Sequence, residues 1–235
     1  MQNTHMHMLQ HRNSLFFPLA SALLLTLALP WVGLTFFAWV ALVPLLLFVS
    51  DERVSRSKLF FGTAIALLAY MLAVAYPLMH IEGAWWAGTH ELDRYLSESI
   101  QFTGGMVLAA CWRVLFFLFF IPVARYGATK RYGALLLAVL WVLIEWAYAT
   151  LGLWGYSAGV IGYSLIDSAY EKHAAYIGGV YLLSFIVVLT NVVIAQVLLL
   201  QLKQQKKLFL NAPMLVPTFL FLAIVLCYGF FAERP

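Results

Sequence analysis

Long apolar stretches, separated by short polar segments, occupy nearly the whole chain. Most of these stretches reach or approach the roughly 20 residues that a helix needs to cross a bilayer. The pattern predicts an all-α bundle with seven membrane spans, placed at about 15-29, 31-49, 59-79, 100-123, 134-152, 175-202 and 209-231. The membrane domain then fills residues 15-231, with a polar tail at 1-14 and a short tail at 232-235.

The first apolar run, from Leu15 to Val49, covers 35 residues. It is too long for one span and suits two spans joined by a tight turn at residues 30-33, which gives seven spans rather than six. The run also resembles the hydrophobic part of a signal peptide, but it lacks a small-x-small cleavage site before Trp31. We therefore interpret it as an uncleaved signal-anchor.

Composition agrees with a membrane protein. The chain is 64% hydrophobic and 10% charged, with a mean hydropathy of +0.89, whereas globular proteins are about 25% charged. The two cysteines, Cys111 and Cys227, lie inside apolar runs and form neither a disulfide framework nor a metal-binding pattern. We expect no metal and no cofactor.

The basic residues are distributed unevenly between the two sides of the predicted bundle. Ten of the 14 Lys and Arg fall on the side of the N-terminus: Arg12, Arg53, Arg56, Lys58, Arg125, Lys130, Arg131, Lys203, Lys206 and Lys207. The opposite side receives Arg94, Lys172 and Arg234 together with most of the acidic residues. Because positive charge is retained in the cytoplasm, we expect a cytoplasmic N-terminus and a periplasmic C-terminus. The net charge of +4 then faces anionic lipid and implies no nucleic-acid partner.

Glu145 lies in the middle of the fifth predicted span, in the run VLWVLIEWAYA. Arg113 lies at a matching depth in the fourth span, which runs antiparallel to the fifth. Either charge alone would cost about 2.5–3.5 kcal/mol near the centre of a bilayer. We therefore predict an intramembrane Arg113–Glu145 pair, either as a structural contact or as part of a proton or substrate path.

Four stretches carry a resemblance to a known family. They are LALPWVGLTFFAWVALVPLLL (27 to 47), LWVLIEW (140 to 146), GYSLID (162 to 167) and GGVYLLSFIVVLTNVVIA (178 to 195). In this order they resemble the membrane part of apolipoprotein N-acyltransferase, and the resemblance covers about residues 27 to 232. The pair Gly178-Gly179 that opens the last stretch is expected to permit close packing of helices.

The resemblance implies lipoprotein maturation at the bacterial cytoplasmic membrane. Members of that family transfer an acyl chain from a phospholipid, through a cysteine thioester, onto the N-terminal cysteine of an apolipoprotein. Their catalytic Glu-Lys-Cys set lies in a nitrilase-like domain that follows the membrane part. This sequence ends at Pro235. We expect it to lack that domain, so no catalytic residue is carried over, and we expect no acyl transfer by this chain alone.

The chain also departs from the family pattern. The resemblance implies an arginine three residues after the glutamate, where this chain has Tyr148. It implies a Phe-Pro-Trp run where this chain has Leu153-Trp154-Gly155-Tyr156, and a tryptophan near Tyr76-Pro77.

Aromatic and basic residues gather in the two longer outer loops. They are Trp85, Trp86 and Arg94 in the first loop, and Trp154, Tyr156, Tyr163 and Lys172 in the second. Aromatic residues at the interface are typical of any membrane protein, where they form an anchoring belt. The sharper interpretation is a lipid headgroup site, in which Arg94 and Lys172 hold the phosphate through charge-assisted hydrogen bonds.

Three functions remain open at this point. The first, which we prefer, is a stand-alone or split membrane scaffold or subunit of lipoprotein N-acylation. It either works with a separate nitrilase-like protein or remains a non-catalytic binder of phospholipid or lipoprotein. The second is a small-solute transporter or channel that uses the Arg113–Glu145 site. The third is an inactive, truncated remnant of the acyltransferase.

Overall fold

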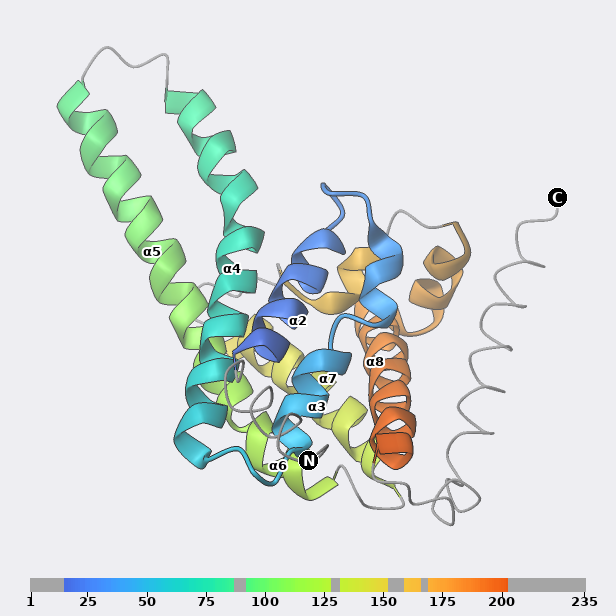
Figure 1. Ribbon diagram of the computed structural model, residues 1–235. Helices are drawn as coiled ribbons and strands as arrows, with labels where there is room; N and C mark the ends of the chain where they lie inside the picture. Colours follow the sequence, from blue (N-terminus) through green and yellow to red (C-terminus); the bar gives the residue numbers. More distant parts are fainter. Residues whose placement is uncertain (1–14, 87–91, 128–131, 152–158, 166–168, 203–235) are drawn as a thin grey trace, which may run out of the picture.

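Every element in the described part of the chain is a helix, so the all-α prediction is confirmed for these residues. The computed structural model describes the backbone of residues 15–86, 92–127, 132–151, 159–165 and 169–202 (Figure 1). Within these ranges, the side chains at 78–86, 92–103, 106, 169–177, 200 and 202 lie outside the description.

The described elements, in chain order, are α2 (Phe16–Leu27), η1 (Thr35–Trp39), α3 (Val43–Ser50), α4 (Arg56–Trp86), α5 (Leu92–Leu118), α6 (Phe120–Gly127), α7 (Gly133–Leu151), η2 (Ile161–Leu165) and α8 (Ala169–Leu202). Four segments among them are long and apolar enough to cross a membrane: Arg56–Pro77, Val107–Gly127, Gly133–Leu151 and Gly178–Leu199. They correspond to the third, fourth, fifth and sixth predicted spans. The seventh, at 209-231, lies outside the described residues.

The first apolar run forms a hairpin, with its turn where the sequence predicts one. The backbone N–H groups of Val32 and Gly33 both donate to the carbonyl of Leu29. Gly33 has φ of +81°, a conformation that glycine adopts without strain. Neither arm is a helix of about 20 residues, however, so two spans in this run are not confirmed. The first arm is the 12-residue α2, and the second arm is interrupted between the 3₁₀ helix η1 and the eight-residue α3.

Pro44 accounts for this interruption. It lies in the first turn of α3, where its missing N–H costs nothing, but in a continuous helix its ring would clash with the carbonyl of residue 40. Pro122 acts in the same way between α5 and α6, because its ring would clash with the carbonyl of residue 118 in a continuous helix. The fourth predicted span is accordingly divided at Phe119, whose N–H donates to the carbonyl of Phe116.

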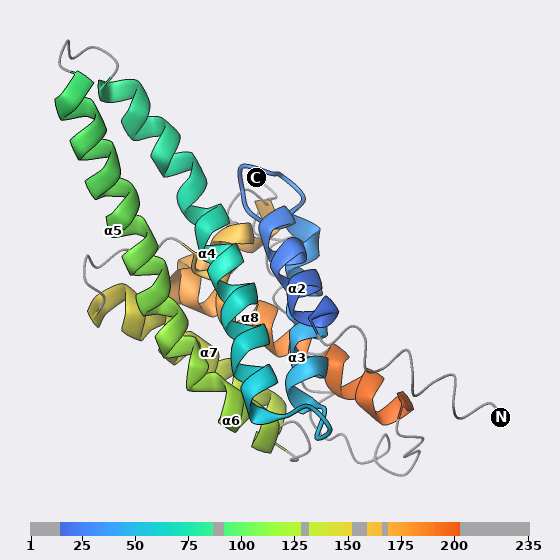
Figure 2. The ribbon, with the colours of Figure 1, turned by 60° about the vertical axis from the view of Figure 1, so that its left-hand side comes forward.

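Helices α4 and α5 form a long antiparallel arm. The two lie side by side, and their connected ends project beyond the other helices (Figure 1; Figure 2). Helix α4 has 31 residues, which at 1.5 Å per residue give a length of about 46 Å. The hydrocarbon core of a bilayer measures about 30 Å. Helix α4 is therefore longer than the hydrocarbon core is thick.

Helix α8 is broken at Gly178 and Gly179, whose backbone angles are not helical. Gly179 has φ of +67°, and a Cβ built on it would meet no atom within 4 Å. The expectation that this pair permits close helix packing is therefore wrong at Gly179, which instead supplies a left-handed backbone conformation. The break separates residues 169–177 from the span Gly178–Leu199.

Two of the predicted cytoplasmic segments meet at one end of the bundle. Arg125 of α6 donates from Nη2 to the carbonyl of Glu52 (2.9 Å) and from Nη1 to the carbonyl of Val54 (3.5 Å). These carbonyls lie between α3 and α4, next to the exposed Arg56 and Lys58. The charge pattern therefore placed these two segments correctly on a common side.

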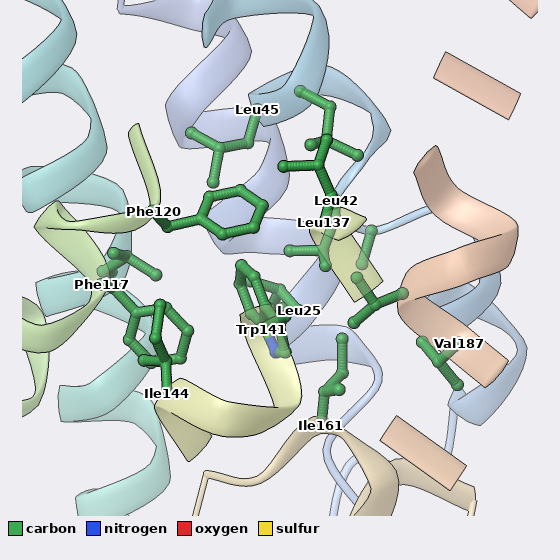
Figure 3. Packing of buried hydrophobic residues seen from close by; sticks show 14 of the residues in the cluster. Leu25, Leu42, Leu45, Phe117, Phe120, Leu137, Trp141, Ile144, Ile161 and Val187 are labelled. Atoms are coloured by element: carbon green, nitrogen blue, oxygen red, sulfur yellow. The ribbon is translucent and has the colours of Figure 1, made fainter. Parts of the chain in front are cut away.

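The apolar core is centred on Trp141 of α7. Its ring packs against Phe117 (centroids 4.5 Å apart) and edge-on against Phe120 (5.2 Å). Figure 3 shows these aromatic side chains from α5 and α6 beside Trp141, with Leu42 and Leu45 of the hairpin and Ile161 of η2 around them. The core thus joins the hairpin to the long helices.

Buried polar side chains complete the hydrogen bonds of the interrupted hairpin. Asn191 of α8 is fully buried; its Oδ1 accepts from the N–H of Leu42 (2.8 Å), and its Nδ2 donates to the carbonyl of Ala38 (2.8 Å). Ser21 of α2 accepts from the N–H of Leu45 at 2.8 Å. Because lipid offers no hydrogen bonds, backbone groups at membrane depth need partners inside the protein.

We expect Asn191→Leu to destabilise the domain strongly. The change leaves the N–H of Leu42 and the carbonyl of Ala38 buried without a partner, at about 1–3 kcal/mol for each group. Thr190→Val is the matched control, because the Thr190 hydroxyl bonds only to the Ile186 carbonyl of its own helix. Thermal unfolding of the detergent-solubilised protein should show a large loss for the first variant only, and equal melting would contradict this role.

Candidate functional site: a buried carboxylate that caps the buried helix η2

Glu145 is fully buried, with 0% of its surface exposed. Its Oε1 accepts two hydrogen bonds, one from Trp141 Nε1 one turn earlier on α7 (2.9 Å) and one from the backbone N–H of Ile161 (2.8 Å). Ile161 is the first residue of η2, where a helix leaves backbone N–H groups without internal partners. The carboxylate therefore caps the start of η2.

Ser184 of α8 supplies the next bond to the same segment. Its hydroxyl accepts from the N–H of Gly162 at 2.9 Å. A Cβ on Gly162 would collide with the carbonyl of Val180 and lie 2.9 Å from the backbone nitrogen of Ser184. Only glycine permits this contact. Helices α7 and α8 thus hold η2 inside the bundle, where four of its five residues are buried.

Arg113 of α5 reaches the same cluster. Its side chain is 7% exposed, its guanidinium lies over the ring of Tyr148 (5.1 Å to the centroid), and its Nη1 lies 3.9 Å from Met71 Sδ. Tyr148 interacts electrostatically with both Arg113 and Glu145. The structure therefore brings the two predicted charges together around one tyrosine, and a direct ion pair between them stays a prediction.

Tyr70 of α4 connects this cluster with the residues before η2. Its hydroxyl donates to the carbonyl of Gly159 at 3.3 Å. Gly159 has φ of +86°, and a Cβ there would lie 3.2 Å from Met71 Sδ. Four helices and η2 consequently converge on Glu145.

Few of the predicted outer-loop residues fall in the described part of the chain. Tyr163 lies on η2 and is half-buried. The side chains of Trp85, Trp86, Arg94 and Lys172, and all of Trp154 and Tyr156, lie outside the described residues. The lipid headgroup site therefore stays a prediction.

No group of three His, Cys, Asp or Glu side chains that could hold a metal ion occurs among the described residues. Cys111 lies exposed on α5, with apolar Leu108 and Leu115 exposed on the same helix. Cys227 lies outside the description.

A family model, the apolipoprotein N-acyltransferase N-terminal domain, matches residues 21–193. The chain belongs to this family. Comparison with curated proteins and with solved structures gave no match. The match together with the four apolar spans makes this a multi-pass membrane protein related to lipoprotein N-acylation.

The hydrogen bonds described above connect the four stretches that resemble the apolipoprotein N-acyltransferase membrane domain. Asn191, in the fourth stretch, binds the first; Glu145, in the second, binds the backbone just before the third; and Ser184, in the fourth, binds the third. The family resemblance implies an arginine at position 148. Here the tyrosine at that position lies under the guanidinium of Arg113.

Sequence reasoning singled out Glu145 and Arg113 but missed Ser21, Ser184 and Asn191. Asn191 gave the same signal as Glu145, a polar side chain inside the apolar run FIVVLTNVVIA. The two serines gave a weaker signal, since serine is common at contacts between membrane helices.

The charge pairing predicts an order of stability among three variants. Arg113→Leu leaves a buried carboxylate uncompensated, which typically costs about 3–5 kcal/mol. Adding Glu145→Gln removes that charge and keeps an oxygen for the N–H of Ile161. We therefore expect the double variant to melt at a higher temperature than Arg113→Leu, with Glu145→Gln alone as the reference. A double variant that is equally stable or less stable would contradict the pairing.

Proposed function

We propose that this protein is the membrane-embedded part of a lipoprotein N-acylation system in the bacterial cytoplasmic membrane. In this role it binds phospholipid, or the acyl chains of a lipoprotein, next to the site of acyl transfer. The observation that carries the proposal is the family match over residues 21–193. Four polar side chains hold the second arm of the hairpin and η2 in place, and all four lie within this range: Ser21, Glu145, Ser184 and Asn191.

The acyl-transfer chemistry itself requires a thiolate, a base and a group that stabilises the oxyanion. The reacting thiolate is not assigned to Cys111, which lies exposed on α5 with apolar Leu108 and Leu115 exposed on the same helix. We therefore propose that a separate nitrilase-like protein supplies the reacting residues. The present chain would then hold the lipid and dock that partner.

The projecting arm of α4 and α5 supports a place for the lipid headgroup. Arg94 lies near the start of α5, and Trp85 and Trp86 lie at the end of α4, so the fold brings the backbone of these residues to the tip of the arm. Lys172 lies in the first part of α8, before the break at Gly178. In Figure 1 the backbone of this part of α8 lies on the other side of the bundle from the tip of the arm. We propose that Arg94 and Lys172 each contact a lipid phosphate, and that the tryptophans contact acyl chains.

The transporter alternative receives no support from the described residues. Glu145 has one oxygen engaged by Trp141 and by the backbone of Ile161, an arrangement that fixes the carboxylate rather than leaving it to bind a passing solute.

Complementation tests the proposed function. Cells depleted of their own apolipoprotein N-acyltransferase would express this chain with or without soluble nitrilase-like proteins from the same genome. We expect mass spectrometry of a reporter lipoprotein to show N-acylation only when such a partner is present. Leu143→Ala, a change on the exposed face of α7, should leave the result unchanged. Absence of N-acylation in every pairing would overturn the proposal.

Lipid binding tests the headgroup site. We expect Arg94→Ala combined with Lys172→Ala to weaken binding of phospholipid vesicles severalfold, because both proposed contacts to the phosphate are lost. Arg56→Ala combined with Lys58→Ala removes two exposed cations from the opposite, basic end and is the matched control. If the two double variants bind alike, the headgroup site is not at Arg94 and Lys172.

A further inference from the structure

Two polar atoms in the Glu145 cluster have no hydrogen-bond partner in the protein. They are Glu145 Oε2 and the hydroxyl oxygen of Tyr148, and each has less than 1 Å² of exposed surface. Both belong to α7, three residues apart, and therefore lie on one face of that helix. Their neighbours are otherwise well satisfied, since Glu145 Oε1 alone accepts two hydrogen bonds.

An unpaired polar atom in this position is costly. A buried donor or acceptor left unsatisfied costs about 1–3 kcal/mol, and more for a charged group. In the interior of a membrane protein, lipid cannot supply the missing bond. Native proteins rarely leave such groups unpaired, and ordered water commonly completes them.

The chemistry of the two atoms is complementary. A carboxylate oxygen only accepts hydrogen bonds, whereas a phenol can donate one. The two do not bond directly, and a group that accepts from the phenol and donates to the carboxylate would satisfy both. Water does both. The guanidinium of Arg113, which lies over the Tyr148 ring, brings further donors to the same cluster.

We infer that the Glu145 cluster binds an ordered water molecule that bridges Glu145 Oε2 and the hydroxyl of Tyr148. This water site lies beside η2, in the same cluster as Arg113 and Tyr70. With this water, both oxygens of the carboxylate are hydrogen-bonded: Oε1 holds η2 and Oε2 binds the water. The inference goes beyond the proposed role in N-acylation and does not depend on it.

X-ray radiolysis of the full chain in lipid nanodiscs tests this site, because hydroxyl radicals formed from a bound water label the side chains beside it even when these are buried. Phe117 is the matched control: it is as buried as Tyr148, at 1% exposure each, and the two rings are in contact (5.7 Å between centroids). With each rate divided by that of the unfolded chain, we expect Tyr148 to be labelled severalfold faster than Phe117. Equal rates overturn the inference.

The melting temperature of Tyr148→Phe is an independent test of the bound water. If water bridges the two groups, the variant leaves that water and Glu145 Oε2 short of a partner, and the melting temperature falls. If no water is present, the variant removes an unpaired buried hydroxyl, and the melting temperature rises. A rise therefore overturns the inference. If the variant fails to fold, radiolysis of the unaltered protein still tests whether the water is bound.

Discussion

A lipid bilayer offers no hydrogen bonds, and this one constraint organises the described part of the domain. Uninterrupted helices meet it by themselves, since their N–H and carbonyl groups bond within the segment. Two segments do not satisfy their own backbone groups in this way: the second arm of the hairpin, around residues 38–45, and the buried helix η2. Each is held by buried polar side chains that take the place of the missing backbone partners. Asn191 and Ser21 serve the hairpin, and Glu145 and Ser184 serve η2.

The hydrogen bonds of these side chains suggest a physical reason for the resemblance to the family. Each of the four stretches that resemble apolipoprotein N-acyltransferase contains one of these two segments or a side chain that binds one of them. Helices α7 and α8 carry most of these binding side chains, and their apolar faces build the core around Trp141. An arrangement of this kind keeps irregular backbone inside the membrane without exposing it to lipid. Irregular backbone is also what a membrane domain needs if it is to shape a site for a ligand.

The long helices could be predicted from the sequence because hydropathy and length record them directly. The turn at residues 29–33 was predictable for the same reason, as its proline and glycine interrupt an overlong apolar run. The break before Pro44 was harder, since the residues on both sides of it are as apolar as those of a span. Glu145 stood out because a carboxylate in an apolar run demands a partner. Arg113 could be predicted as a partner because its charge is evident in the sequence. The N–H of Ile161 could not, because every residue except proline carries a backbone N–H.

The bond between Asn191 and Leu42 joins positions 149 residues apart. The hairpin is synthesised long before α8, and a chain grows at about 5–20 residues per second, so Leu42 waits about 7–30 seconds for Asn191 to be made. The N–H of Leu42 and the carbonyl of Ala38 therefore obtain these bonds only after α8 has been made. The first part of this domain to be synthesised depends on one of the last for its final structure.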